Sequence, residues 1–253
     1  MFAPPPHLIL DPDHYTDHDL GPLKTGKEAE VFVVERVAAD GRRCLLAHKR
    51  YRPRRVSAKG ELEALGFQRA ASFVHDAGYR DGRVIGNSRD RRAVARRSAH
   101  GRTVLGRGWV DREFEALGRL AHVGVSVPYP VERTADGILM EYLGDGRSAA
   151  PRLVAAALDR PTATRAAELL VSDLGRMLGA GLVHADLSVY NLLWWQDRPW
   201  IIDLPQAVDV SSHAQALDLL RRDLGNVAPW FIRHGVSFDP DEVFVDLLPF
   251  AYG

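Results

Sequence analysis

The stretch that most constrains this chain runs from Leu182 to Asn191. An apolar pair enters it, a polar loop occupies its centre, and the apolar run Leu192–Trp195 follows, so we expect a loop that leads into a strand. Asp186 lies inside it, Asn191 follows five residues later, and Asp203 lies twelve residues beyond that. This layout suits phosphoryl transfer, in which one Asp orients the attacking hydroxyl while an Asn and another Asp hold magnesium on nucleotide phosphates. The alternative is a polar turn with an unrelated Asp downstream.

Length and composition narrow the class of protein. The 253 residues, 46% of them hydrophobic, fit one large domain or two small lobes with a buried core. The single cysteine, Cys44, excludes an intrachain disulfide and a cysteine zinc site. No run approaches the roughly 18 apolar residues of a membrane span, and no secretory signal is recognisable. We therefore expect a cytoplasmic protein that makes no membrane contact.

The absence of net charge hides two segments of opposite sign. Residues 1–20 contain four Asp and no Lys or Arg, and we interpret them as an extended acidic arm. Residues 80–107 contain nine Arg against two Asp and few large apolar side chains, which predicts a mobile loop. Such a basic loop either contacts a phosphate backbone or folds over ATP or an acidic protein.

A β pattern dominates the first half of the chain. Residues 29–37 and 43–51 read as strands joined by a tight turn at Asp40-Gly41, and Lys49 lies near the end of the second strand. His48 is expected on the opposite face from Lys49, because side chains alternate along a strand. Residues 138–142 predict a further strand of the same sheet.

The turn before the first of these strands contains Thr25, Gly26 and Lys27. Backbone N–H groups around a glycine can cover phosphates, and a lysine adds positive charge. Most turns of this kind bind nothing, so the feature gains weight only beside others.

Helical patterns follow. Residues 57–75 and 109–123 read as helices, the second of them carrying Glu113. Residues 161–180 predict a long helix with a leucine-rich stripe, and a helical tail is expected from about residue 215. A hairpin of residues 192–202 lies between these last two helices.

The order of these parts predicts the architecture. A β-rich half carries the glycine turn, Lys49 and Glu113, and a helical half carries Asp186, Asn191 and Asp203. Protein-kinase-like folds order a phosphate-covering loop, a lysine, its glutamate, a catalytic loop and a metal-binding Asp in this way. We therefore expect an α+β, two-lobed protein-kinase-like fold. Its β-rich N-lobe would span residues 21–142 and its truncated helical C-lobe residues 143–253.

Four segments resemble the RIO family of atypical serine/threonine protein kinases. Residues 25–29 look like its phosphate loop, 184–191 like its catalytic loop, 202–206 like its metal loop, and 109–114 like the start of its glutamate-bearing helix. The resemblance runs from about Pro22 to Val236. The phosphate loop favours the type-one branch or a bacterial relative. Val189 departs from the family, which usually has Glu at that position.

The resemblance implies a nucleotide site in the N-lobe. Lys49 would contact the α- and β-phosphates of ATP and pair with Glu113, while Thr25, Gly26 and Lys27 would cover the phosphates. The adenine pocket would be lined by the connector between the lobes, at Met140, Glu141 and Leu143.

The resemblance implies the chemical groups of the C-lobe as well. Asp186 would be the catalytic Asp, and Ser188 would help to shape the phosphate site. Asn191 and Asp203 would bind Mg²⁺, for which Mn²⁺ is an alternative.

The implied reaction transfers the γ-phosphate of ATP to a protein, including the enzyme itself. Ala185 stands where ordinary protein kinases have an Arg that can read a phosphorylated activation loop, so control of that kind is not expected. Fifty residues follow Asp203, too few for a full peptide-docking subdomain. An ATPase switch in ribosome assembly and a small-molecule phosphotransferase therefore remain alternatives. The protein phosphoacceptor is unknown, and residues 80–107 are the candidate contact with ribosomal RNA or a ribosomal subunit.

Overall fold

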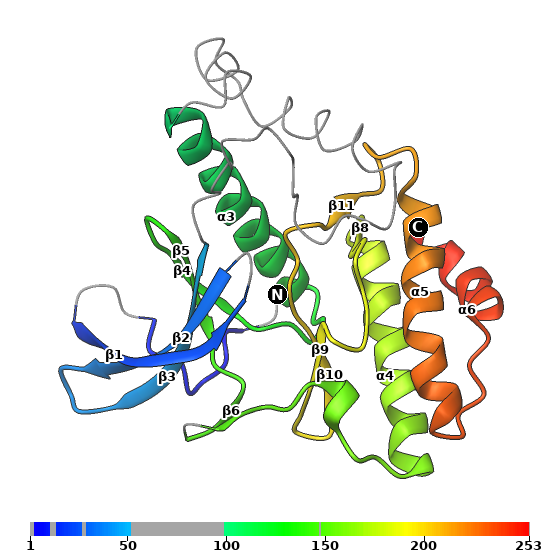
Figure 1. The fold of residues 1–253 in the computed structure, drawn as a ribbon, viewed down its shortest axis with the longest axis horizontal. Helices are drawn as coiled ribbons and strands as arrows, with labels where there is room; N and C mark the ends of the chain where they lie inside the picture. The colour runs from blue at the N-terminus through cyan, green and yellow to red at the C-terminus, as the bar shows by residue number, and fades with distance from the viewer. Residues whose placement is uncertain (1–2, 11–13, 27–28, 52–98, 147, 253) are drawn as a thin grey trace, which may run out of the picture.

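The computed structural model describes residues 3–10, 14–26, 29–51, 99–146 and 148–252. An antiparallel sheet forms one lobe and helices dominate the other, as Figure 1 shows with the blue strands on the left and the yellow-to-red helices on the right. The predicted α+β, two-lobed architecture is confirmed. The helix predicted for residues 57–75 lies outside the described residues.

The N-lobe is built on a five-stranded antiparallel sheet with the order β1-β2-β3-β5-β4. Its strands are β1 (Tyr15–Thr25), β2 (Ala29–Ala38), β3 (Arg43–Tyr51), β4 (Pro130–Arg133) and β5 (Gly137–Glu141). The register pairs Val31 with Lys49 and Ala47 with Met140. Since paired residues share a face, these four side chains lie on one face of the sheet.

The predicted extended acidic arm of residues 1–20 is wrong for the parts of it that the structure describes, residues 3–10 and 14–20. Tyr15 begins the edge strand β1, and Leu8 and Ile9 are buried beneath the opposite face of the sheet against Leu46 and Leu139. The physical reason is that this face is apolar and needs a cover.

The acidic residues of β1 are also part of the fold. Asp17 accepts two hydrogen bonds of 2.8 Å from the guanidinium of Arg36, which is only 2% exposed. A bidentate carboxylate of this kind compensates a buried arginine, so the acidic composition reflects pairing within the sheet.

Helix α3 (Ala99–His122) starts earlier than the sequence predicts. The predicted loop of residues 80–107 is therefore wrong for residues 99–107, while residues 80–98 lie outside the described part. The amphipathic segment after Trp109 supplies the helix nucleus, and each further residue adds a hydrogen bond without a new nucleation cost. Figure 1 shows α3 descending from the top of the view and ending between the sheet and the helices of the C-lobe.

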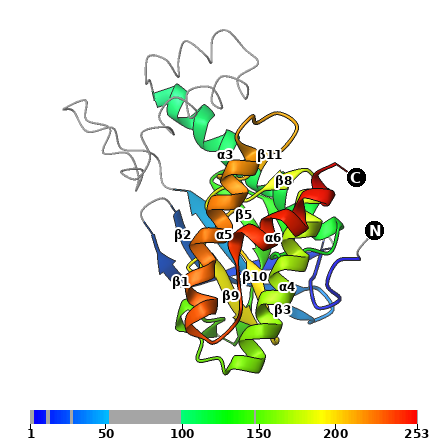
Figure 2. The same ribbon diagram turned by 90° about the vertical axis from the view of Figure 1, so that its right-hand side faces the viewer.

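The C-lobe contains three helices of eight or more residues among those described. They are α4 (Arg160–Gly179), α5 (Ala216–Arg233) and α6 (Pro240–Leu247) (Figure 2). Asp159 caps α4 by accepting a 3.0 Å hydrogen bond from the N–H of Thr162. The predicted helix over residues 161–180 and the predicted tail from about residue 215 agree with α4 and α5 to within about one residue.

The remaining elements are short, and all but η2 lie between β5 and α5 in the chain. They are β6 (Gly144–Asp145), β7 (Ser148–Ala149), η1 (Leu153–Ala155), β8 (Leu182–Val183), β9 (Leu192–Trp195), β10 (Arg198–Ile201), β11 (Val208–Asp209) and η2 (Leu248–Ala251). The predicted hairpin is the pair β9–β10, and β11 pairs with β8.

One hydrophobic core extends through the C-lobe and reaches into the N-lobe. Leu117 and Leu120 of α3 and Ile138 of β5 belong to the same buried cluster as Leu170 of α4 and Leu224 of α5. The two lobes therefore share packing where α3 ends. Within the described residues, no helix has both the length and the hydrophobicity that crossing a membrane requires.

Candidate active site

Lys49 lies at the junction of the two lobes. Its Nζ donates to both carboxylate oxygens of Glu113 in α3, at 2.7 and 2.9 Å, and to Oδ1 of Asp203 in the C-lobe at 2.8 Å. Burial alone would lower the pKa of Lys49, but the two carboxylates outweigh it and raise that pKa, so the amine stays charged. One cation thus connects the sheet, α3 and the C-lobe.

Glu113 is held by more than Lys49. Its carboxylate also accepts hydrogen bonds from the Tyr51 hydroxyl and from the N–H of Leu204, the latter at 3.1 Å. The side chain is 2% exposed, so each of these donors compensates a charge that has lost its water. Sequence reasoning found the Lys49–Glu113 pair but missed Tyr51 and Leu204.

His184 ties the loop of Asp186 to the segment that carries Asp203. Its Nε2 lies 3.1 Å from the carbonyl oxygen of Ile202, and its Nδ1 accepts from the N–H of Asp186 at 3.3 Å. Burial lowers the pKa of His184, so the ring is neutral. A neutral ring with its proton on Nε2 satisfies both contacts.

The backbone of the same loop is anchored by helix α5. The buried carboxylate of Asp223 accepts hydrogen bonds from the N–H groups of Ala185, at 2.7 Å, and Leu187, at 3.0 Å. The Arg222 side chain donates to the carbonyl of Ala185, and that of Asn226 donates to the carbonyl of Leu187 at 3.1 Å. Four contacts from one helix therefore fix the conformation around Asp186.

Two residues of the site have a left-handed backbone. Ala185 has φ 65° and Asp203 has φ 70°, values that residues other than glycine seldom adopt. Hydrogen bonds with Arg222 and Asp223 of α5 hold the backbone of Ala185, and the hydrogen bond that Lys49 donates to Asp203 holds the second residue. Backbone strain of this kind clusters at functional sites.

Asp186 and Asp203 influence each other electrostatically. Loss of solvation and the nearby charge of Asp203 raise the pKa of Asp186, while Arg222 opposes the rise. Burial would raise the pKa of Asp203, but Lys49 outweighs it and lowers that pKa. The charge of Lys49 does not balance the carboxylates of Asp186 and Asp203 together. A divalent cation between the lobes would offset the remaining negative charge.

Asn191 completes an oxygen-rich set. Its Nδ2 donates to the backbone carbonyl of Asp186 at 2.9 Å, which leaves Oδ1 as an acceptor. Lys49 occupies only one carboxylate oxygen of Asp203. An amide oxygen and a carboxylate oxygen are ligands that Mg²⁺ accepts, so these residues fit such an ion. No group of three or more His, Cys, Asp or Glu suited to a metal occurs among the described residues.

An apolar surface continues from Lys49 along the sheet. Val33 and Ala47 are buried in one small cluster with Tyr142, and Met140 packs against it. Val33 and Ala47 were missed by sequence reasoning, although alternation counted back from Lys49 would have found Ala47.

The remaining predicted residues lie at three places. Thr25 ends β1, and the N–H of Gly26 donates to the carbonyl of Ala29 at 2.9 Å, closing the turn into β2. Lys27 lies outside the described residues. Ser188 lies two residues after Asp186, where its carbonyl accepts from the N–H of Asn191 at 2.9 Å.

The connector residues predicted to line the adenine pocket do not all direct their side chains toward it. The Glu141 side chain contacts His7, at 3.2 Å, and the N–H of Tyr129. These contacts lie on the sheet face away from Lys49, so Glu141 can line the site only through its backbone. The carbonyl of Leu143 accepts from the N–H of Ala150 at 2.9 Å. His48 points to the same far face, as expected, where it contacts Thr134 at 3.0 Å.

Together, the two lobes and the buried Lys49–Glu113 pair with Asp203 define a protein of the protein-kinase-like class. The family model described as RIO domain matches residues 71–243. The RIO-type serine/threonine-protein kinase Rio1 of Haloferax volcanii is 34% identical over 232 residues, which covers 92% of this chain and 69% of that protein. The chain therefore belongs to the RIO family of serine/threonine protein kinases.

Other organisms have similar proteins as well. The RIO-type serine/threonine-protein kinase Rio1 of Thermoplasma acidophilum is 34% identical over 135 residues, covering 53% of this chain and 69% of that protein. The human serine/threonine-protein kinase RIO1 is 28% identical over 218 residues, covering 86% of this chain and 34% of that protein.

Proposed function

We propose that this kinase transfers the γ-phosphate of ATP, held with Mg²⁺, to a Ser or Thr hydroxyl of a protein, itself included. The observation that carries the proposal is the buried contact of Lys49 with Glu113 and Asp203 across the lobes. A charged lysine beside a metal-binding Asp is what binding of nucleotide phosphates requires.

The sheet and the connector would bind the nucleotide. Lys49 would donate to the α- and β-phosphates, and the turn of Thr25, Gly26 and Lys27 would cover them. Val33 and Ala47 offer an apolar surface of the kind that adenine packs against. The N–H of Leu143 has no acceptor within the described residues, which supports its use by the base.

Asn191 and Asp203 would hold the Mg²⁺, which neutralises charge on the transferred phosphate when it is bound. The oxygen acceptors that these residues leave open support this assignment. Ser188 lies between Asp186 and Asn191 in the chain and would border the phosphates.

Asp186 would orient the acceptor hydroxyl and take its proton. The side chain is exposed, as a residue that meets an acceptor must be, while its backbone is fixed from α5. A raised pKa suits this role, because a carboxylate that loses its proton less readily also accepts one more readily.

A second candidate function is that of an ATPase. Only residues 204–215 separate Asp203 from α5, and part of that short segment is tied down in the β8–β11 pair. Such a short segment offers little surface for gripping a peptide. The basic residues 80–107 are our proposed contact with ribosomal RNA or a ribosomal subunit, on their charge alone.

The two functions differ in where the γ-phosphate goes. The enzyme is incubated with γ-labelled ATP and Mg²⁺, alone and with myelin basic protein, and protein-bound label and free phosphate are measured together. Label on serine or threonine supports the kinase, and free phosphate with unlabelled protein supports the ATPase. If neither forms above the level of Asp186→Asn, both assignments fail.

A further inference from the structure

Arg152 lies where the chain enters the C-lobe, between β7 and η1. Its backbone forms an antiparallel bridge with Leu193 of β9, and the carbonyl of Pro151 accepts a 2.8 Å hydrogen bond from the N–H of Trp194. Leu153, which follows directly, is fully buried. The position of the Arg152 backbone is therefore fixed on both sides.

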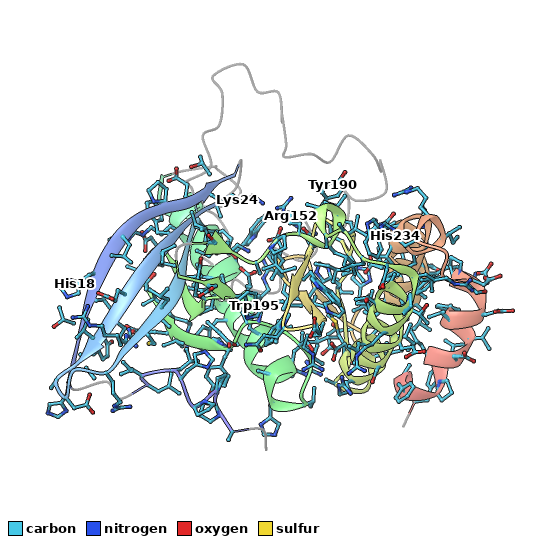
Figure 3. All side chains as sticks on the ribbon, turned by 90° about the horizontal axis from the view of Figure 1, so that it is seen from below. His18, Lys24, Arg152, Tyr190, Trp195 and His234 are labelled. Carbon is cyan, nitrogen blue, oxygen red and sulfur yellow. The ribbon has the colours of Figure 1, made fainter. Side chains whose placement is uncertain are left out.

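The register of this bridge sets the direction of the side chain. Leu192 is fully buried in the C-lobe core, so Leu193, its neighbour in β9, faces the other way. Residues that pair across strands share a face, so Arg152 also faces away from the C-lobe core. Figure 3 labels Arg152 between the blue sheet and the C-lobe, on the side of the molecule that carries Tyr190 and Lys24.

The same strand places Arg152 near Asp203. Segment 151–152 lies along one side of β9, and β10 pairs with the other side. Just after β10, the N–H of Ile202 donates to the carbonyl of Asn191 at 3.0 Å. Leu193 pairs with both Arg152 and Trp200, so two strand spacings, about 10 Å, separate the backbones of Arg152 and Trp200, and Asp203 follows Trp200 by three residues.

The guanidinium of Arg152 has no hydrogen bond or ion pair to any residue in the described part of the chain. Two other arginines that lose water are paired: the buried Arg36 binds Asp17 at 2.8 Å, and the half-buried Arg50 binds Asp19 at 3.0 Å. The Arg152 side chain is half-buried, and its charge acts on Asp203 over a longer distance than a hydrogen bond or ion pair. Five N–H donors in a fixed fork are thus directed at the junction of the lobes without a protein acceptor.

We propose that Arg152 binds the phosphate groups of the nucleotide from the C-lobe side, opposite Lys49. This inference rests on the proposed function, since it assigns a further residue to the same nucleotide site. A guanidinium matches phosphate oxygens in pairs, and it offsets the repulsion between those oxygens and the carboxylate of Asp203. An acidic acceptor peptide is the competing anion, but the connector that carries Arg152 leads from Met140 and Leu143, where the base would bind.

Nucleotides of decreasing charge test this inference. Binding of ATP, ADP, AMP and adenosine with Mg²⁺ is measured by calorimetry for the wild type, Arg152→Gln and Arg152→Lys. Arg198→Gln is the matched control, since Arg198 is also half-buried in the C-lobe but lies at the turn end of the β9–β10 hairpin. We expect Arg152→Gln to bind ATP and ADP about tenfold more weakly and adenosine within about twofold of wild type. Arg152→Lys should lose less, and Arg198→Gln should match the wild type.

Each other outcome is informative. Unchanged ATP affinity in Arg152→Gln overturns the inference, and a raised KM for an acidic acceptor alone assigns Arg152 to the acceptor instead. An equal loss for ATP and adenosine also overturns it, because a phosphate contact cannot weaken a ligand without phosphate. If the wild type itself binds no ATP, the proposed function fails first.

Discussion

Asp223 makes the stability of this kinase depend on pH in a way that can be worked out in advance. The carboxyl group is 1% exposed, and this burial raises its pKa from the usual 3.8 to about 7, although Arg222 and two backbone N–H groups oppose the rise. The folded protein therefore binds a proton here that the unfolded chain has already released. Asp223→Asn replaces this carboxyl group with a neutral amide that does not titrate, so the proton uptake at this position disappears.

The direction and the size of this pH dependence follow from the difference in pKa between the folded and the unfolded protein. A pKa raised in the folded state gives stability that is complete below about pH 4 and is lost as the pH rises through about 7. Between pH 5 and pH 8 the wild type should lose about 2.5 kcal/mol relative to Asp223→Asn. The full difference between the two pKa values corresponds to about 4 kcal/mol.

Urea denaturation followed by tryptophan fluorescence measures the free energy of unfolding of both proteins at pH 5, 6, 7 and 8. Asp218→Asn, an exposed change of the same charge on the same helix, serves as the control. If the difference between wild type and Asp223→Asn changes by less than about 0.5 kcal/mol over this range, the reasoning about Asp223 is refuted.

Three further predictions follow from the same contacts. Lys49→Met leaves Glu113 buried without its cation and should cost about 3 kcal/mol in the free energy of unfolding, measured in urea; a loss below about 1 kcal/mol would contradict the buried pair. Ile9→Ala should lower the free energy of unfolding by about 2 kcal/mol, because Ile9 is 3% exposed under the sheet. An unchanged melting curve would show that residues 3–10 do not pack against the sheet. Arg222→Gln removes a positive charge that opposes the raised pKa of Asp186, so the acidic limb of the pH profile of kcat should move to higher pH. An acidic limb that does not move would show that Arg222 has no effect on the pKa of Asp186.

The pairing of Lys49 with Glu113 could be predicted from the sequence because it rests on local patterns in a known order. Strand alternation directs Lys49 to one face, and the helical pattern after Trp109 carries Glu113. The buried position of Leu8 and Ile9 could not be predicted, because their short apolar run gives no sign of which sheet face it covers. The same limit applied to residues 99–107, whose helix depends on the segment that follows.

Asp223 and Arg152 mark a second limit. Asp223 interrupts the apolar stripe of α5, and nothing nearby in the sequence indicates that its acceptors serve the N–H groups of Ala185 and Leu187. Arg152 gains its direction from a bridge to Leu193, some forty residues later. Contacts between segments far apart in the sequence determine the hydrogen bonds of Asp223 and the direction of the Arg152 side chain. Sequence patterns mainly indicate the structure of residues that are close together in the chain.

We propose that Lys49, Asp186 and Asp203 act together in one phosphoryl-transfer site. The deciding measurement is label transfer from γ-labelled ATP to protein at saturating Mg²⁺, with Asp203→Asn compared to the wild type and to Asp218→Asn. We expect Asp203→Asn to transfer less than about a hundredth of the wild-type label and Asp218→Asn to transfer as much as the wild type. Transfer by a folded Asp203→Asn at a rate near that of the wild type would contradict it.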